Sequence, residues 1–203
     1  MKKQLVLLAL LGSTGAYAQT ELADIQHQWA VCQYQTLSKQ KESCLEQLSK
    51  VADKASANDA SRVDMLIWSA IVESSWAGEK GGLGALDLVK DAKRKLETAI
   101  KLDPRALDGS AFTSLGTLYY QVPGWPIGFG DKKQAEALLK QAVAINPDGI
   151  DANFFYGDFL LNQGRKAEAK TYLQKAMMAQ TRPGRELADK GRRQEIQQRL
   201  DKL

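Results

Sequence analysis

The chain has 203 residues, of which 44% are hydrophobic and 26% charged, and its formal net charge is +4 at pH 7. These proportions are ordinary for a folded globular protein, and they exclude a disordered chain, a collagen-like chain and a protein with many membrane spans. The single histidine excludes a histidine-rich metal site and argues against a Ser-His-Asp triad.

The first 18 residues have the features of a secretory signal peptide. Lys2 and Lys3 precede an apolar run over residues 5–11, and an Ala-Tyr-Ala sequence ends at Ala18. The run is shorter than the roughly 20 residues that span a bilayer, and no cysteine follows it, so we expect no membrane anchor. Cleavage after Ala18 would place the protein in the periplasm or outside the cell. An ordinary N-terminal helix is the alternative interpretation.

Cleavage would also change the charge of the protein. Removing Lys2 and Lys3 leaves a net charge of +2. Such a small excess of positive charge argues against nucleic acid as a partner.

Residues 19–56 are expected to form a helical hairpin. Cys32 and Cys44 are the only cysteines, and a pair in an exported protein is expected to form a disulfide. A tight turn at residues 38–40 would place the two cysteines opposite each other on antiparallel helices. Two buried thiols that never meet are the alternative. The spacing of Cys44, Leu48 and Val51 is similar to the second-helix pattern of the repeat described below.

An internal repeat is the strongest signal in the chain. Three segments share an alanine, a leucine four positions later and a second alanine three positions after that. Pro104 and Pro147 close the first two copies at the same offset, whereas Pro183 closes the third two residues late. The shared residues are Ala92, Leu96 and Ala99, then Ala135, Leu139 and Ala142, then Ala169, Leu173 and Ala176.

Each copy follows another expected helix that contains a small residue. That residue is Ala70 within residues 61–76, Gly116 in Phe112-x-x-Leu115-Gly116-x-x-Tyr119, and Gly157 in Asn153-x-x-Tyr156-Gly157-x-x-Leu160. Small side chains let two antiparallel helices approach closely. No segment alternates with a period of two, so we predict an all-α fold.

The predicted helix pairs occupy about residues 61–104, 109–147 and 150–183, within a repeat region of 57–183. We expect a C-terminal capping helix over residues 184–203, because a repeat array needs a polar end. Leu187, Ile196 and Leu200 are expected to face inward on this helix.

These motifs resemble the tetratricopeptide repeat, whose units run about 34 residues. Gly116 and Gly157 lie 41 residues apart, and a seven-residue insertion between Gly116 and Ala135 accounts for the excess. The resemblance implies a short α-solenoid that binds a protein or peptide in its concave groove without a cofactor. The groove residues would be Thr113, Thr117, Tyr120 and Gln121 in one repeat and Phe154, Asp158 and Leu161 in the next. For Tyr120 and Phe154, packing against the neighbouring helix is the alternative.

The insertion contains the sequence GWPIGFGD, residues 124–131. Trp125 and Phe129 are expected either to bind a partner, as exposed loops on rigid scaffolds often do, or to cover an edge of the core. Asp131 is expected to cap the next helix. The segment also resembles, more loosely, the periplasmic T components of TRAP transporters. That resemblance implies an alternative function, an accessory protein that handles a small apolar or acidic ligand and has a solute-binding protein as its partner.

Catalysis and metal binding have no positive support in the sequence. His27 has no second histidine near it and is interpreted as structural. Asp151 and Asp158 lie seven residues apart on one helix and are interpreted as a solvated groove face, although paired carboxylates can perform acid–base chemistry. The mixed charges of residues 182–201 are likewise interpreted as a solvated face. We therefore expect a binding protein; a hydrolase is the third hypothesis.

Overall fold

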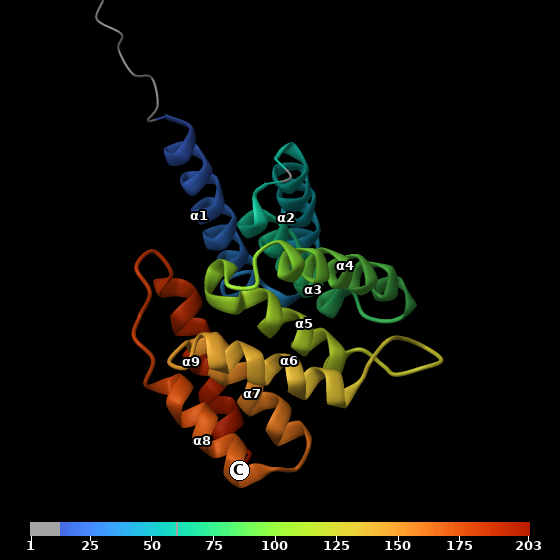
Figure 1. Ribbon diagram of the computed structural model, residues 1–203, viewed down its shortest axis with the longest axis vertical. Helices are drawn as coiled ribbons and strands as arrows, with labels where there is room; N and C mark the ends of the chain where they lie inside the picture. The colour runs from blue at the N-terminus through green and yellow to red at the C-terminus, as the bar shows by residue number, and fades with distance from the viewer. Residues whose placement is uncertain (1–12, 60) are drawn as a thin grey trace, which may run out of the picture.

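A computed structural model of the chain describes residues 13–59 and 61–203. The regular elements within these ranges are all helices, which confirms the all-α fold class (Figure 1). The proposed signal peptide falls mainly outside the described residues, and its last part, residues 13–18, is helical. The α-helices are α1 (Ser13–Tyr34), α2 (Ser38–Asn58), α3 (Val63–Lys80), α4 (Leu86–Leu102), α5 (Ser110–Gln121), α6 (Lys132–Ile145), α7 (Ile150–Asn162), α8 (Lys166–Met177) and α9 (Glu186–Leu200), with short 3-10 helices at Leu83–Ala85 and Ala106–Gly109.

Successive helices pack in antiparallel pairs, α1 with α2, α3 with α4, α5 with α6 and α7 with α8 (Figure 1). The alanines and leucines shared by the three repeat copies are all 0% exposed. A Cβ atom on Gly116 would lie 2.8 Å from Cγ of Leu139, and one on Gly157 would lie 2.8 Å from Cγ of Leu173. The repeat therefore has the physical basis that the sequence indicates, since a small residue on the first helix receives a leucine from the second.

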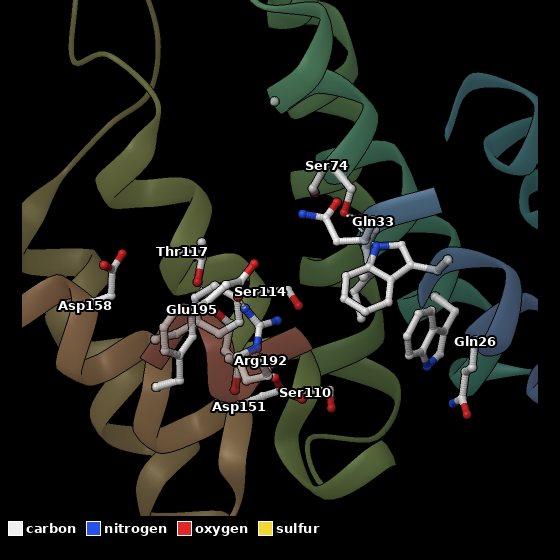
Figure 2. A pocket seen from close by; sticks show the side chains of 18 of the residues that line it. Gln26, Gln33, Ser74, Ser110, Ser114, Thr117, Asp151, Asp158, Arg192 and Glu195 are labelled. Carbon is white, nitrogen blue, oxygen red and sulfur yellow. Dashed lines mark hydrogen bonds and ion pairs between the residues drawn. The ribbon is translucent and has the colours of Figure 1, made fainter. Parts of the chain in front are cut away.

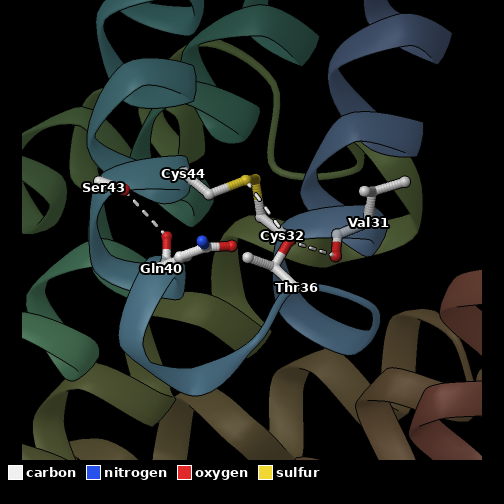
Figure 3. The surroundings of a disulfide bond; sticks show 6 residues. All are labelled: Val31, Cys32, Thr36, Gln40, Ser43 and Cys44. Carbon is white, nitrogen blue, oxygen red and sulfur yellow. Dashed lines mark hydrogen bonds between the residues drawn. A yellow bond between two sulfur atoms is a disulfide. The ribbon is translucent and has the colours of Figure 1, made fainter.

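The hairpin of α1 and α2 contains a disulfide between Cys32 and Cys44, whose Cα atoms are 5.6 Å apart (Figure 3). The predicted turn at residues 38–40 is wrong, because α2 already begins at Ser38. The chain turns at residues 35–37 instead, where the backbone amide and the hydroxyl of Thr36 both donate to the Val31 carbonyl. The similarity of Cys44, Leu48 and Val51 to the repeat pattern does not extend to Val51, since this side chain is 53% exposed and Leu45, Leu48, Ala52 and Ala55 form the buried face.

Helix α9 joins the two ends of the repeat array. It packs on α7 and α8, and it also contacts α1, where Gly191 lies so close to the Tyr34 ring that a Cβ atom would not fit. Ile196 is 0% exposed, and Leu187 and Leu200 are partly buried, as their spacing predicts. The C-terminal helix is therefore more than a cap on the last repeat, since it also closes the concave side of the molecule against α1.

The loop that contains the inserted residues has a fixed base and an exposed tip. Phe129 packs edge-on against Tyr119 at 5.5 Å, and Asp131 accepts hydrogen bonds from the amides of Lys133 and Gln134 at 2.8 and 3.1 Å. Asp131 is thus the N-cap of α6, as predicted. Trp125, by contrast, is 90% exposed, and the loop extends away from the helices (Figure 1). The two aromatic residues therefore have different roles, Phe129 within the fold and Trp125 outside it.

Candidate functional site: a pocket closed by the C-terminal helix

A partly enclosed pocket of about 580 Å³ lies between α1, α3, α5 and α7 on one side and α9 on the other. Its volume falls within the roughly 300–1,000 Å³ of typical small-molecule sites. Trp29 and Trp68, which meet edge-on at 5.8 Å, form an aromatic part of its lining, and Asp151 and Arg192 form a charged part. Neutral polar groups also line the pocket, among them Gln26, Gln33, Ser74, Ser110, Ser114 and Thr117 (Figure 2).

The charged part of the lining consists of two rows of side chains that face each other, Asp151 and Asp158 on α7 and Arg192 and Arg199 on α9. Asp151 accepts a hydrogen bond from Nε of Arg192 at 2.8 Å, and Asp158 accepts one from Nε of Arg199. Both pairs are 41 residues apart in the sequence. Because each row repeats every seven residues, the two helices run parallel and in register along this seam. Asp151 and Asp158 therefore do face the groove side, but their carboxylates bind arginines of α9 instead of forming a solvated face, so that part of the interpretation is wrong.

Arg192 fixes α9 against α7 by stacking as well as by charge. Its guanidinium carbon lies 4.5 Å from the ring centroid of Phe154 and 4.6 Å from that of Phe155. Arg182 donates to the second oxygen of Asp151 at 2.8 Å. Burial favours the neutral form of Asp151, but Arg192 and Arg182 outweigh it and hold the pKa of this carboxyl well below its usual range. Asp151 is therefore an anion that joins two arginines, not a group suited to proton transfer.

Asp158 is also committed to contacts within the fold. Its second oxygen accepts a hydrogen bond from the Tyr120 hydroxyl at 2.8 Å. Burial raises the pKa of Tyr120 well above its usual value, and the Asp158 charge adds to the effect. The Tyr120 ring packs against Phe159 at 5.6 Å. Tyr120 and Asp158 therefore support the wall of the pocket by joining α5, α7 and α9.

Arg185 differs from the other arginines of the pocket. Its guanidinium carbon lies 4.9 Å from the ring centroid of Trp68, and its Nε is buried without a hydrogen-bond acceptor. Burial and the nearby charge of Arg182 lower the pKa of Arg185, although the charges of Asp151 and Asp189 act in the opposite direction. Within the described part of the chain, Arg185 has no carboxylate partner, whereas Arg182, Arg192 and Arg199 each have at least one.

A strained backbone segment contributes to the same pocket. Leu107 and Asp108 both line it, and both have left-handed backbone conformations, with φ values of 48° and 54°. Such a conformation costs a non-glycine residue on the order of 1–3 kcal/mol, and strain of this kind concentrates at binding sites. Ser110 helps to hold the segment, because its hydroxyl donates to the Leu107 carbonyl at 2.6 Å.

The residues expected in the groove fall into three groups. Thr113, Thr117, Gln121, Phe154 and Asp158 line the pocket, Tyr120 lies behind Asp158, and Leu161 packs in the core formed by α6 to α9. Trp125 and Phe129 are on the separate loop. Phe154 is only 3% exposed and lies beneath Arg192, so the alternative of packing describes it correctly.

The functional residues that the sequence interpretation missed are the arginines of residues 182–199. The interpretation of this segment as a solvated face is wrong for Asp189 and Arg192, which are 0% and 8% exposed, and correct for Glu186, Lys190 and Asp201, which are exposed. A usable signal is present, because Arg185, Arg192 and Arg199 recur every seven residues and match the seven-residue step between Asp151 and Asp158. Within the described residues, no cluster of three potential metal ligands occurs, and no helix is long and apolar enough to cross a membrane. His27 is exposed on α1.

Comparison with known proteins identifies the architecture. Residues 127–188 match the tetratricopeptide repeat family. The whole chain is similar to a thermophilic TPR protein of Thermus thermophilus, with a TM-score of 0.60, 20% sequence identity, and coverage of 91% of this chain and 89% of that one. The fold is that of a tetratricopeptide repeat protein. No curated protein matches the chain significantly.

Proposed function

We propose that this protein is an exported adaptor that binds a protein partner through the tip of the 124–131 loop and the adjoining concave side of the repeats. The exposed Trp125 carries the proposal. An indole that is 90% exposed, next to Ile127 at 58%, contributes little to the fold, while Phe129 and Asp131 hold the base of the loop rigid. Aromatic anchors presented on rigid supports are typical of binding hot spots. The tetratricopeptide fold itself suggests a scaffold for protein interactions.

The test compares the capture of partners by three forms of the tagged protein in periplasmic extract. Trp125→Ala should reduce capture about tenfold or more, because a central aromatic anchor contributes roughly 2–4 kcal/mol. Met178→Ala is the matched control, since Met178 is 84% exposed and lies far along the chain from the loop. Equal capture by both variants would refute Trp125 as an anchor, and a lower melting temperature for Trp125→Ala would make the loop structural.

The export of the protein has its own test. N-terminal sequencing should find Gln19 as the first residue of the exported protein.

A second function is favoured by the pocket. Because α9 encloses part of the concave side, the space suits a small ligand better than an extended peptide. This is the accessory role that the resemblance to TRAP-associated T components implies, with a solute-binding protein as the partner. Two observations together support this role: the pocket has the size of a ligand site, and the strained segment at Leu107 and Asp108 lines it.

A further inference from the structure

The ion pairs between α7 and α9 follow a regular spacing that leaves one arginine without an ion-pair partner in the described part of the chain. Arg199 and Arg192 each find an aspartate 41 residues earlier in the chain. Arg185 continues the same seven-residue row, but the residue 41 positions before it is Ala144, at the end of α6. The row of arginines therefore has one more member than the row of aspartates that pairs with it.

Arg185, which has no ion-pair partner among the described residues, lies where a bound ligand could reach it. It lies over Trp68 and lines the pocket. Trp29 is fixed there, because its Nε1 donates to the Ser75 hydroxyl at 2.9 Å and its ring contacts that of Trp68 edge-on at 5.8 Å. Arg185 is partly buried, and its Nε lacks an acceptor within the residues that the structure describes. A cation in such a place gains free energy when an anion reaches it.

The groups around this cation indicate what else the ligand contains. The hydroxyls of Ser74 and Ser75 donate to backbone carbonyls at 2.7 and 2.8 Å, so toward the pocket they can only accept hydrogen bonds. Gln26 and Gln33 on α1 supply amides that can both donate and accept (Figure 2). This lining suits a ligand body that has polar groups of its own.

We propose that Arg185, supported by Trp68, is the subsite for the anionic group of a small organic anion bound in this pocket. The guanidinium fork binds the two oxygens of a carboxylate or sulfonate side by side. The inference rests on the small-ligand function proposed above, and it is independent of partner binding through Trp125.

The experiment uses two fluorescent probes that share an aromatic body and differ in charge. 8-Anilinonaphthalene-1-sulfonate carries an anionic group, whereas N-phenyl-1-naphthylamine is neutral. Arg185→Gln should weaken binding of the sulfonate probe about tenfold or more and leave the neutral probe unchanged, since only the sulfonate loses a charged hydrogen bond. Arg185→Lys should retain part of the affinity. Arg105→Gln is the control, because it removes the same charge from an exposed residue outside the pocket.

A further variant tests whether the probes bind in this pocket. Ser114→Trp fills the middle of the pocket and should abolish binding of both probes, with folding checked by circular dichroism. If the sulfonate probe binds equally to the wild type and to Arg185→Gln while Ser114→Trp abolishes binding, the pocket remains a ligand site and the anion subsite is refuted. If both probes still bind to Ser114→Trp, they lie elsewhere, and the small-ligand function fails as well.

Discussion

At the scale of single residues, the two glycines on the first helices decide how closely the repeats pack. Gly116 and Gly157 occupy the same place in successive repeats, and each faces a leucine from its paired helix. The leucine fills the space that a side chain would need. This contact is the reason that a glycine, which is a poor helix former, occurs in the middle of α5 and α7.

Gly157→Ala should therefore destabilise the protein by about 1–3 kcal/mol, because the new Cβ would meet both Cγ of Leu173 at 2.8 Å and its backbone nitrogen at 3.2 Å. Gly78→Ala in α3 is the control. A Cβ there meets nothing within 4 Å, so the change should be neutral or stabilise by up to about 1 kcal/mol. Urea unfolding measures both, and an unchanged stability for Gly157→Ala would contradict the packing argument.

A partly buried ionic cluster joins α2, α3 and α4. The Lys95 ammonium lies 2.9 Å from Glu73, 2.7 Å from Asp53 and 2.9 Å from Asp91. Burial opposes the charge of Lys95, but hydrogen bonds to these carboxylates outweigh it and raise the pKa of Lys95 well above its usual range. Burial raises the pKa of Glu73 to about 7, although Lys95 acts in the opposite direction.

The Glu73 carboxyl should make stability depend on pH. Its pKa is higher in the folded protein than the roughly 4.3 of an unfolded chain, so its contribution is complete below about pH 4 and is lost as the pH rises through 7. Relative to Glu73→Gln, the wild type should lose about 1–2 kcal/mol between pH 5 and 8, a figure reduced for solvent screening. Urea unfolding of both proteins at the two pH values tests this, and a constant difference would refute it.

At the scale of elements, the disulfide holds together the hairpin that faces α9. Cys32 is 3% exposed, and Cys44 lies 12 residues further along the chain. Since α1 supplies Trp29, Gln26 and Gln33 to the pocket, the position of α1 relative to α2 affects the site as well as the fold.

Replacing both cysteines by alanine should lower the free energy of unfolding by about 3 kcal/mol, the entropy expected for a closed loop of this length. Peptide mapping without reductant should recover Cys32 and Cys44 in one linked fragment. Dithiothreitol should destabilise the wild type and leave the double variant unchanged. Two free thiols in the native protein would contradict the pairing.

At the scale of the whole molecule, contact between α9 and α1 turns an open array into a closed one. In an open repeat protein each unit contacts only its neighbours, so distant units can unfold separately. Here Gly191 allows α9 to reach Tyr34, and the first hairpin is coupled to the last repeat. Both α1 and α9 line the pocket.

Gly191→Leu should separate α9 from α1 and uncouple the two ends of the array. Tryptophan fluorescence reports mainly on Trp29, Trp68 and Trp76 in the first half. Its unfolding transition should then have a different midpoint from the transition followed by far-ultraviolet circular dichroism. The two signals should coincide in the wild type. Lys190→Leu at the adjacent exposed position is the control. Coincident transitions in Gly191→Leu would show that the closure does not couple the ends.

Much of the fold follows from local signals. The repeated alanines and leucines, the two glycines and the N-cap Asp131 act within a single helix pair, and the spacing of such residues is visible in the sequence. The position of the turn after Tyr34 does not follow in this way. A backbone carbonyl, that of Val31, ends α1 by accepting bonds from residues 35 and 36, and a carbonyl leaves no sequence signature.

By itself, the sequence determined the helical class, the pairing of neighbouring helices and the length of the inserted loop, since these depend on contacts between residues close in the chain. Only the tertiary structure decided that Phe129 packs inward while Trp125 does not, that α9 lies against α7 and α1, and that the Nε of Arg185 has no acceptor among the described residues. These outcomes depend on how helices far apart in the sequence meet. A stripe of arginines has the same appearance in the sequence whether it faces water or a matching row of aspartates.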